Sequence, residues 1–493
     1  MSSDSGLARK KLSKTLKPHW VWAIALGSSI GWGSFVLPAE WMDGVGPLGV
    51  ILGLTIGAVL MAIIAISYGV LIRNYPVSGG EFAYAFLSLN RVHAYISGWF
   101  LTLGYICIVA LNATAFALML KFVFPDFIEN MRMYSVAGWE VYFTEVIVVT
   151  ILVAFFTYLN IKGSGLSGRM QFVFVMILII GVFSLTGLMT TNSGASFNHM
   201  DPVFSPEVSP IAAILTIVAI APFAYVGFDN VPQAAEEFKF SARKALTLIM
   251  MALVFAAIIY SLMIITTAVA APWQETSAAG LQWGTGTVVQ EVLGTGGLVI
   301  LVIALSMGIF TGLNGFLISA SRVLFAMSRG KVLPKVFSKL HSQHNTLYFA
   351  IIFAAIVAII APWFGREVLG WIVDMSSVGV SIAYFYTCFT AYKMLKWNKK
   401  DSNYDETLHI VSPGKKFVAI LGMISSVSFL ILLLYPNSPA ALGAESIWAL
   451  VIWVALGILF YFVRRIDLQS YDREDLAYLI LGKEKFKLTD KED

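Results

Sequence analysis

The sequence predicts an all-α membrane protein that crosses the bilayer twelve times. Of its 493 residues, 58% are hydrophobic and only 13% are charged, and the mean hydropathy is +0.79. Water-soluble domains carry about 25% charged residues. Because so few polar side chains cannot cover a large soluble surface, we expect lipid to surround most of the chain. Two further observations agree with this: twelve apolar windows have the length of a membrane span, and basic residues gather in alternate connecting segments.

The twelve windows define the expected helices. A membrane-spanning helix needs about 20 mostly apolar residues. A large soluble helical protein would instead need amphipathic helices with polar faces, and window 417–434 has no such face. The expected spans are residues 19–44, 48–72, 93–120, 141–160, 170–190, 207–234, 246–271, 296–321, 346–363, 370–392, 417–434 and 446–463.

Lysine and arginine positions predict the orientation, because cytoplasmic loops carry an excess of these residues. If both termini are cytoplasmic, only Lys121, Arg132 and Arg366 of the 33 basic residues fall outside the cytoplasmic segments and the adjoining ends of the spans. The reverse orientation would break the rule almost completely. We therefore expect both termini in the cytoplasm.

Composition also excludes some classes of protein. The two cysteines, Cys107 and Cys388, lie in apolar runs, which argues against a secreted disulfide scaffold. A net charge of only +4 disfavours a nucleic-acid-binding protein. No metal-ligand cluster, nucleotide loop or catalytic triad is visible in the sequence, so we expect neither an enzyme nor a bound cofactor or metal.

Two of the twelve spans contain glycines at mid-membrane depth. The first holds Gly27-Ser28-Ser29-Ile30-Gly31-Trp32-Gly33-Ser34, and the sixth holds Pro222-Phe223-Ala224-Tyr225-Val226-Gly227-Phe228-Asp229. Glycines in membrane helices often serve close helix packing instead. Two interruptions five spans apart favour unwound helices in inverted repeats, with a substrate site where the repeats meet.

Unwound helices offer backbone groups to a ligand. Unwinding near Gly31–Gly33 frees N–H groups at the positive end of a half-helix, which suits a carboxylate. Unwinding near Phe223–Gly227 frees carbonyl groups, which suit an ammonium group. A site with both features matches an α-amino acid.

Five motifs along the chain carry a resemblance to one family. They are Gly31-x-Gly33-Ser34-Phe35 with Leu37-Pro38; Tyr75-Pro76-x-Ser78-Gly79-Gly80-Glu81-Phe82-x-Tyr84; Leu159-Asn160-x-x-Gly163 with Gln171; Phe223-Ala224-Tyr225-x-Gly227-Phe228-Asp229 with Ala235-Glu236-Glu237 and Lys239; and Asn314-Gly315 with Ser321-Arg322-x-Leu324-Phe325-Ala326-Met327-x-Arg329-Gly330-x-x-Leu333-Pro334. Their order and spacing resemble the amino acid–polyamine–organocation (APC) superfamily of transporters, over residues 19–463.

The resemblance implies the leucine-transporter fold, a 5+5 inverted repeat plus two peripheral helices. The implied segments are an N-terminal tail, two five-helix repeats, a cytoplasmic loop, a last helix pair and a C-terminal tail. They cover residues 1–18, 19–193, 194–393, 394–416, 417–463 and 464–493, respectively.

The resemblance also implies the contacts of the substrate. The N–H groups near Trp32 and Gly33, in the stretch that begins at Gly31, would hold its carboxylate. The carbonyls of Ser29, Phe223 and Val226 would hold its amino group. The implied side-chain pocket and gates complete the set: Ile106, Ala110, Ala224 and Gly312 line the pocket, and the aromatic rings of Phe223 and Phe316 act as gates.

The coupling ion is left open by the sequence. Many relatives carry a lysine in span 5 where this chain has Leu178. Three transport mechanisms therefore stay open: sodium coupling, exchange or facilitated diffusion, and protonation of another group. For sodium, oxygens would come from span 1 and a hydroxyl near Thr311, although Gly312 replaces the usual hydroxyl residue. For protons the candidate is Asp229, whose alternative role is to cap the second half of span 6.

The expected function is transport of amino acids by alternating access, as a secondary active transporter or an exchanger. No acidic residue except Asp229 lies in the pocket stretches, so a neutral side chain is favoured over cationic amino acids or polyamines. Glu40, Asp43, Glu145 and Asp374 are expected near the outer ends of their spans, solvated or ion-paired. A sensor that uses the transport fold without net flux is the alternative of another class.

The expected partners and location follow from the same features. The partners are a small amino acid and the lipid bilayer, and we expect a monomer or homodimer in a bacterial plasma (inner) membrane. Animal relatives attach a heavy chain through a cysteine after span 3, and residues 122–140 contain none. A disulfide-linked heavy chain is therefore not expected.

Overall fold

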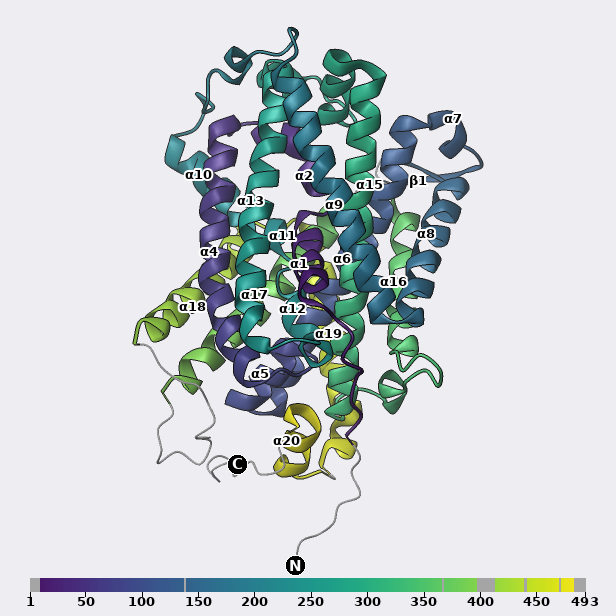
Figure 1. Cartoon of the computed structure of the whole chain (residues 1–493), viewed down its shortest axis with the longest axis vertical. Coiled ribbons are helices and arrows are strands. Elements are labelled where there is room, and N and C mark those ends of the chain that lie inside the picture. The colour runs from purple at the N-terminus through teal and green to yellow at the C-terminus, as the bar shows by residue number, and fades with distance from the viewer. Residues whose placement is uncertain are drawn as a thin grey trace, which may run out of the picture.

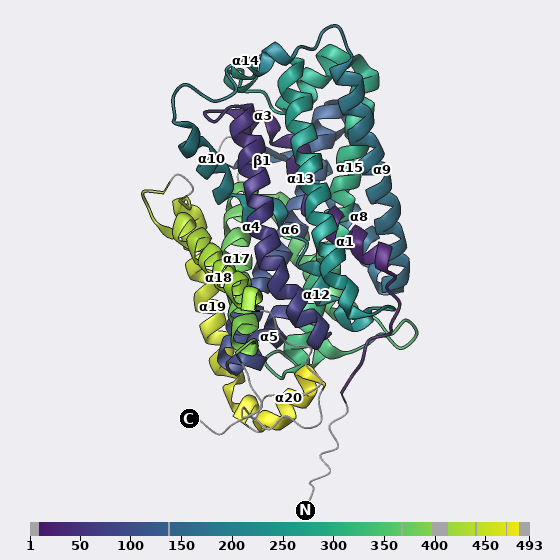
Figure 2. The ribbon, with the colours of Figure 1, turned by 60° about the vertical axis from the view of Figure 1, so that its left-hand side comes forward.

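The computed structural model describes residues 9–136, 139–365, 368–396, 413–438, 441–469 and 471–482. The molecule is an elongated bundle of helices (Figure 1). Its first described residue, Arg9, lies beside the last helix, α20 (Arg473–Leu481), because the Arg9 Nε donates to the Leu479 carbonyl at 3.2 Å. We call this the α20 end. The opposite end holds the short helix α3 (Pro38–Met42), as Figure 2 shows.

Within the described ranges, nine helices are long and apolar enough to cross a membrane, which confirms an all-α membrane protein. Each coincides with an expected span or contains it, within a few residues at the ends. They are α4 (Pro47–Asn74), α6 (Arg91–Val123), α8 (Phe143–Lys162), α9 (Ser164–Thr190), α13 (Ala245–Ala270), α15 (Gly284–Arg329), α17 (Val368–Met394), α18 (Pro413–Leu434) and α19 (Ala444–Gln469).

The other three expected spans are built from shorter helices. Window 19–44 forms α1 (Pro18–Ile30), α2 (Gly33–Val36) and α3. Window 207–234 forms α10 (Pro210–Ala219), α11 (Ala221–Tyr225) and α12 (Asn230–Gln233). Window 346–363 forms α16 (Tyr348–Ile360), which continues into the 3₁₀ turn η5 (Ala361–Phe364).

The remaining elements lie in the connections. Helix α15 bends at Gly294, where φ is 65°, a backbone conformation that glycine adopts without strain. An antiparallel hairpin joins α7 to α8. The connecting elements are α5 (Gly80–Ser88), α7 (Pro125–Ile128), β1 (Arg132–Val136), β2 (Trp139–Tyr142), α14 (Trp273–Ala278), and the 3₁₀ turns η1 (Phe197–Met200), η2 (Ala235–Glu237), η3 (Ala242–Lys244) and η4 (Lys335–Ser338).

The two interrupted spans meet near the centre of the bundle. Helix α1 stops at Gly31, where φ is 50°, and the α11–α12 break contains Gly227, where φ is 127°. Side chains with a Cβ rarely adopt either conformation. A Cβ on Gly227 would lie 2.6 Å from the Ser28 Cβ, so the two breaks touch each other. Both spans are therefore broken as predicted and the breaks are adjacent, but Phe223–Tyr225, expected in the unwound stretch, form the end of α11.

Candidate functional site

One tyrosine holds the two breaks together. The Tyr260 hydroxyl of α13 lies 2.7 Å from the Ala224 carbonyl and 3.1 Å from that of Ser29. It also lies 3.3 Å from the Ile30 carbonyl. The Ser29 hydroxyl donates directly to the Tyr225 carbonyl at 3.0 Å. Sequence reasoning missed Tyr260, because nothing in span 7 marks the tyrosine that faces the breaks.

Several backbone groups at the breaks have no partner. In the described part of the chain, no other residue pairs with the N–H groups of Trp32, Gly33 and Ser34. The carbonyls of Phe223 and Val226 likewise accept no hydrogen bond there. Buried backbone groups normally find partners. The breaks thus present unpaired donors on one segment and unpaired acceptors on the other, beside the Tyr260 bridge.

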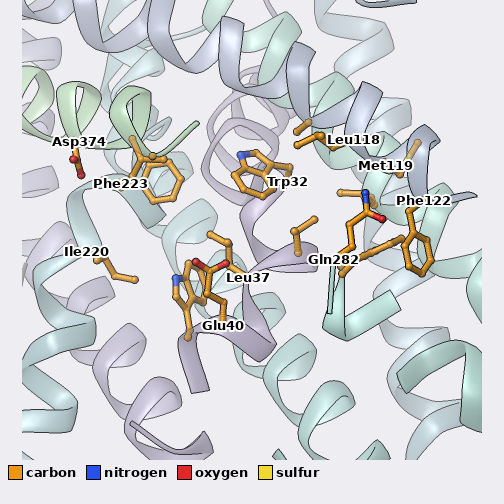
Figure 3. Close-up of a pocket in the computed structure, with 17 residues that line it drawn as sticks. Trp32, Leu37, Glu40, Leu118, Met119, Phe122, Ile220, Phe223, Gln282 and Asp374 are labelled. Atoms are coloured by element: carbon orange, nitrogen blue, oxygen red, sulfur yellow. The ribbon is translucent and has the colours of Figure 1, made fainter. Parts of the chain in front are cut away.

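A cavity of about 550 Å³ extends from the breaks toward the α3 end. Trp32 and Phe223 both line it, and Figure 3 shows the Phe223 ring toward Asp374 and the Trp32 ring toward Leu118. The lining is largely apolar and aromatic, and it includes two carboxylates, Glu40 and Asp374. This volume suits a small organic molecule. Trp32 is 7% exposed, and its indole N–H has no hydrogen-bond partner among the described residues.

The predicted pocket residues divide into two groups. Trp32 and Phe223 line the cavity, and the Cβ position of Gly33 lies 3.8 Å from the Phe223 ring. The others are not among the residues that line it: Ser29, Gly31, Ile106, Ala110, Ala224, Val226, Gly312 and Phe316. The ring of Phe316 packs on Tyr105, with 5.6 Å between centroids, and does not line this cavity.

The side chain of Asn112 lies close to the broken part of α1. Its Oδ1 would stand 3.8 Å from a Cβ on Gly31 and 2.6 Å from one on Gly312. That oxygen is buried and has no hydrogen bond within the described ranges. Sequence reasoning gave Asn112 no role in the site, although an asparagine in the middle of an apolar span is the signal that could have found it.

The oxygens considered for sodium do come together. The Thr311 hydroxyl lies 3.0 Å from the Gly27 carbonyl and 2.9 Å from the Gly308 carbonyl. The position considered for a lysine, Leu178, is fully buried and apolar. Nearby, the Gln171 amide lies 3.0 Å from the Thr311 carbonyl and 3.4 Å from that of Ala23, so a neutral group bridges α1 and α15.

Asp229 does not cap α12, which corrects that interpretation. Its side chain accepts no N–H from the first turn of α12. Instead, one oxygen accepts the Gly227 N–H at 2.7 Å and the other accepts the Tyr105 hydroxyl at 2.8 Å. Asp229 is fully buried. It therefore supports the broken stretch from within and joins it to α6.

The acidic residues expected near the outer span ends have different surroundings. Glu40 is exposed in the cavity wall, and Asp374 accepts the Ser446 hydroxyl at 2.6 Å. Asp43 is exposed. Glu145, however, is 1% exposed, and neither of its oxygens accepts a hydrogen bond in the described part of the chain. Of the two expected states, solvated or ion-paired, the solvated one is wrong for Glu145.

A cluster of charged residues closes the α20 end. Glu236 lies between Arg329, at 2.9 Å, and Arg9, at 3.3 Å. Burial favours a higher pKa for Glu236, but the two guanidinium groups outweigh it and hold that pKa below its usual value. Next to this cluster, Glu237 pairs with Arg322 at 2.7 Å. The cavity at the breaks reaches none of these residues.

Comparisons with known proteins agree with this architecture. A family model described as amino acid permease matches residues 20–456. The branched-chain amino acid permease BcaP of Bacillus subtilis is 24% identical over 92% of this chain and 93% of its own. The methylthioribose transporter of the same organism is 24% identical over 92% and 94%. The lysine-specific permease LysP of Escherichia coli is 23% identical over 78% of each chain.

Proposed function

The chain belongs to the amino acid permease family, and on this premise we propose that it moves neutral amino acids by alternating access. The family consists of transporters and not enzymes, and the apolar helices make this chain a multi-pass plasma membrane protein. The proposal extends to a secondary active or exchange mode. The observation that carries it is the pair of adjacent breaks, with unpaired N–H groups on one and unpaired carbonyls on the other.

Each break suits one half of an α-amino acid. A carboxylate would accept the free N–H groups of Trp32, Gly33 and Ser34, next to the cavity wall. An ammonium group would donate to the free carbonyls of Phe223 and Val226. Such charge-assisted hydrogen bonds are about twice as strong as neutral ones. A neutral side chain would then occupy the aromatic and aliphatic part of the cavity.

The topology belongs to the same proposal. We propose twelve spans, counting the three windows built from short helices, arranged as two inverted repeats over residues 19–193 and 194–393 with two further helices. The α20 end would face the cytoplasm, as the placement of the lysines and arginines predicts. The structure would then describe an outward-facing form, open at the α3 end and closed at the α20 end.

A cationic substrate is the second candidate. Glu40 and Asp374 line the cavity, and carboxylates would attract a positively charged side chain. The relative LysP is named as lysine-specific. Among the described residues the Glu40 carboxylate is in the cavity wall without a hydrogen bond or ion pair, so its charge is available to a molecule that enters from the α3 end.

Uptake by reconstituted vesicles tests the proposal. Purified protein is placed in liposomes loaded with a panel of unlabelled amino acids, and uptake of labelled leucine and labelled lysine is measured. Separate proton and sodium gradients are applied. The expected result is saturable leucine uptake. If the vesicles take up lysine or putrescine but no neutral amino acid, a neutral substrate is excluded. Uptake that depends on internal amino acid and on neither gradient would identify exchange.

A further inference from the structure

Glu81, in the connecting helix α5, is a carboxylate with no exposed surface. The Tyr68 hydroxyl of α4 donates to its Oε1 at 2.6 Å. The side-chain amide of Gln233, at the end of α12, contacts its Oε2. Both partners are neutral, so they stabilise the carboxyl group without balancing a negative charge.

No basic group faces Glu81 in the part of the chain that the structure describes. The titratable groups around it are tyrosines of α4, α5, α6 and α17 and one further carboxylate: Tyr68, Tyr84, Tyr105, Tyr384 and Asp229. The basic groups of elements packed against α5 have other partners: Arg322 with Glu237, Arg329 with Glu236, Lys393 with the Ser88 carbonyl, His93 with Tyr386, and Arg473 with the Leu89 carbonyl. Two further basic residues of α6, Arg91 and Lys121, also make interactions of their own.

The neighbouring acids show what is unusual about Glu81. Glu237 is also buried and the Glu236 side chain is only 10% exposed, and each has an arginine within 3 Å. Removing a charged group from water costs several kcal/mol unless an opposite charge compensates it. Since Glu81 lacks that compensation, its neutral, protonated form is favoured. Burial and the charge of Asp229 accordingly raise the pKa of Glu81 to about 8.

A chain of hydrogen bonds joins Glu81 to the break in span 6. The Gln233 amide that contacts Glu81 also lies 3.3 Å from the Tyr105 hydroxyl. That hydroxyl donates to Asp229, which in turn accepts the Gly227 N–H. Two buried carboxylates thus belong to one polar network, and in such a pair the charge of one opposes ionisation of the other.

We propose that Glu81 and Asp229 form one shared proton-binding site, which couples amino acid movement to the movement of a proton. This proposal rests on the transport function proposed above. A proton from water binds a carboxylate oxygen of the pair. It returns to water when the α20 end opens and water reaches α5. The Gln233 side chain can pair with either the ionised or the protonated form of Glu81. A 180° rotation of its amide group would bring its unpartnered Oε1 to a protonated Glu81 as an acceptor.

Transport driven by a proton gradient tests this site. Proteoliposomes with entrapped pyranine, a pH-sensitive dye, are given labelled leucine, or labelled lysine where leucine is not taken up. For one proton per amino acid, a gradient of about one pH unit supports about tenfold accumulation. We expect this accumulation and vesicle acidification in the wild type. Wild-type transport that is indifferent to the proton gradient and leaves pyranine unchanged would overturn the shared proton site, although the transport function would stand.

Variants locate the site. Glu81→Gln is expected to lose gradient-driven accumulation while still exchanging internal for external amino acid, which shows that it is folded. Asp229→Asn is also expected to lose gradient-driven accumulation, and its folding is checked by thermal unfolding, because Asp229 supports the break as well. The matched control Glu275→Gln changes an exposed carboxylate of α14 and should behave as the wild type. Tenfold accumulation by Glu81→Gln would refute its role. If Glu81→Gln does not fold, Glu81→Asp, which keeps the acid, must still accumulate amino acid. A wild type without leucine or lysine transport would instead contradict the proposed function itself.

Discussion

The backbone of Gly227 lies directly against Ser28. A Cβ on Gly227 would stand 2.6 Å from the Ser28 Cβ and 2.5 Å from its carbonyl carbon. This contact brings the break of α1 together with the break between α11 and α12. The unpaired donors of one segment therefore face the same region as the unpaired acceptors of the other.

Gly227→Ala should disrupt both breaks. The new Cβ would clash with Ser28 and would strain a residue whose φ is 127°. We expect a loss of about 1–3 kcal/mol in stability together with the loss of amino acid binding. Thermal unfolding and labelled uptake are the measurements. Gly187→Ala, where a Cβ meets nothing within 4 Å, is the control. Full uptake by Gly227→Ala would show that the contact does not shape the site.

Gly33→Leu should abolish substrate binding while membrane insertion is unaffected. A Cβ at this position is tolerated, since its nearest neighbours are 3.4 and 3.8 Å away. A leucine would extend further toward Phe223 and cover the free N–H groups. Gly33→Ala is the matched control and should retain binding. Both are measured by labelled uptake and by the amount of protein in purified membranes, and normal transport by Gly33→Leu would remove Gly33 from the site.

Tyr260→Phe should weaken binding with little effect on insertion. The variant removes one hydroxyl that touches the Ser29, Ile30 and Ala224 carbonyls. Leaving buried acceptors without a donor costs about 1–3 kcal/mol, which corresponds to a roughly 5-fold to 150-fold rise in the apparent KM. Tyr435→Phe, at an exposed tyrosine, is the control. An unchanged KM would show that Tyr260 does not hold the breaks in their binding geometry.

Glu236→Gln should destabilise the closed α20 end. It would leave Arg329 and Arg9 buried without their counter-charge, at a cost of about 3–5 kcal/mol. Because the folded state lowers the pKa of Glu236, its contribution is present above the usual carboxylate pKa and is lost as the pH falls through the lower folded value. Thermal unfolding of wild type and variant across acidic pH checks this. The exposed Glu474→Gln is the control, and equal melting temperatures would contradict the prediction.

Glu40→Gln should separate the two substrate classes. For a neutral amino acid, the loss of this charge leaves uptake nearly unchanged, because the backbone of the breaks makes the main contacts. For a cationic substrate, a lost charge contact of about 1 kcal/mol would lower uptake severalfold at low salt. Uptake of labelled leucine and of labelled lysine is compared, with exposed Asp43→Asn as the control.

Much of this protein could be predicted from local patterns. Spanning helices are visible because each needs only a continuous apolar window, and nine were found at their expected places. The breaks were visible because Gly31 and Gly227 interrupt such windows, and the structure places both in conformations that favour glycine. The backbone positions of the site followed from the breaks themselves.

The roles of individual side chains needed the folded structure. Asp229 was a candidate proton carrier or a helix cap from its place in the chain, and the cap is wrong, because its partners are Gly227 and a tyrosine of another span. Glu145 was expected to be solvated or ion-paired because it stands near a span end, yet it is buried. In both cases the surroundings come from distant segments, which a single span does not contain.

The sequence by itself determined that this chain is a membrane protein, which of its spans are interrupted, and where backbone groups become available. These properties depend on apolar length and on glycine, which act over one helix. Only the tertiary structure decided which groups stay unpaired and which acids lack a cation. Glu81 and Gln233 are 152 residues apart in the chain, and their contact exists because α5 packs beneath the broken span. The charge balance of a buried carboxylate is thus a property of the whole bundle.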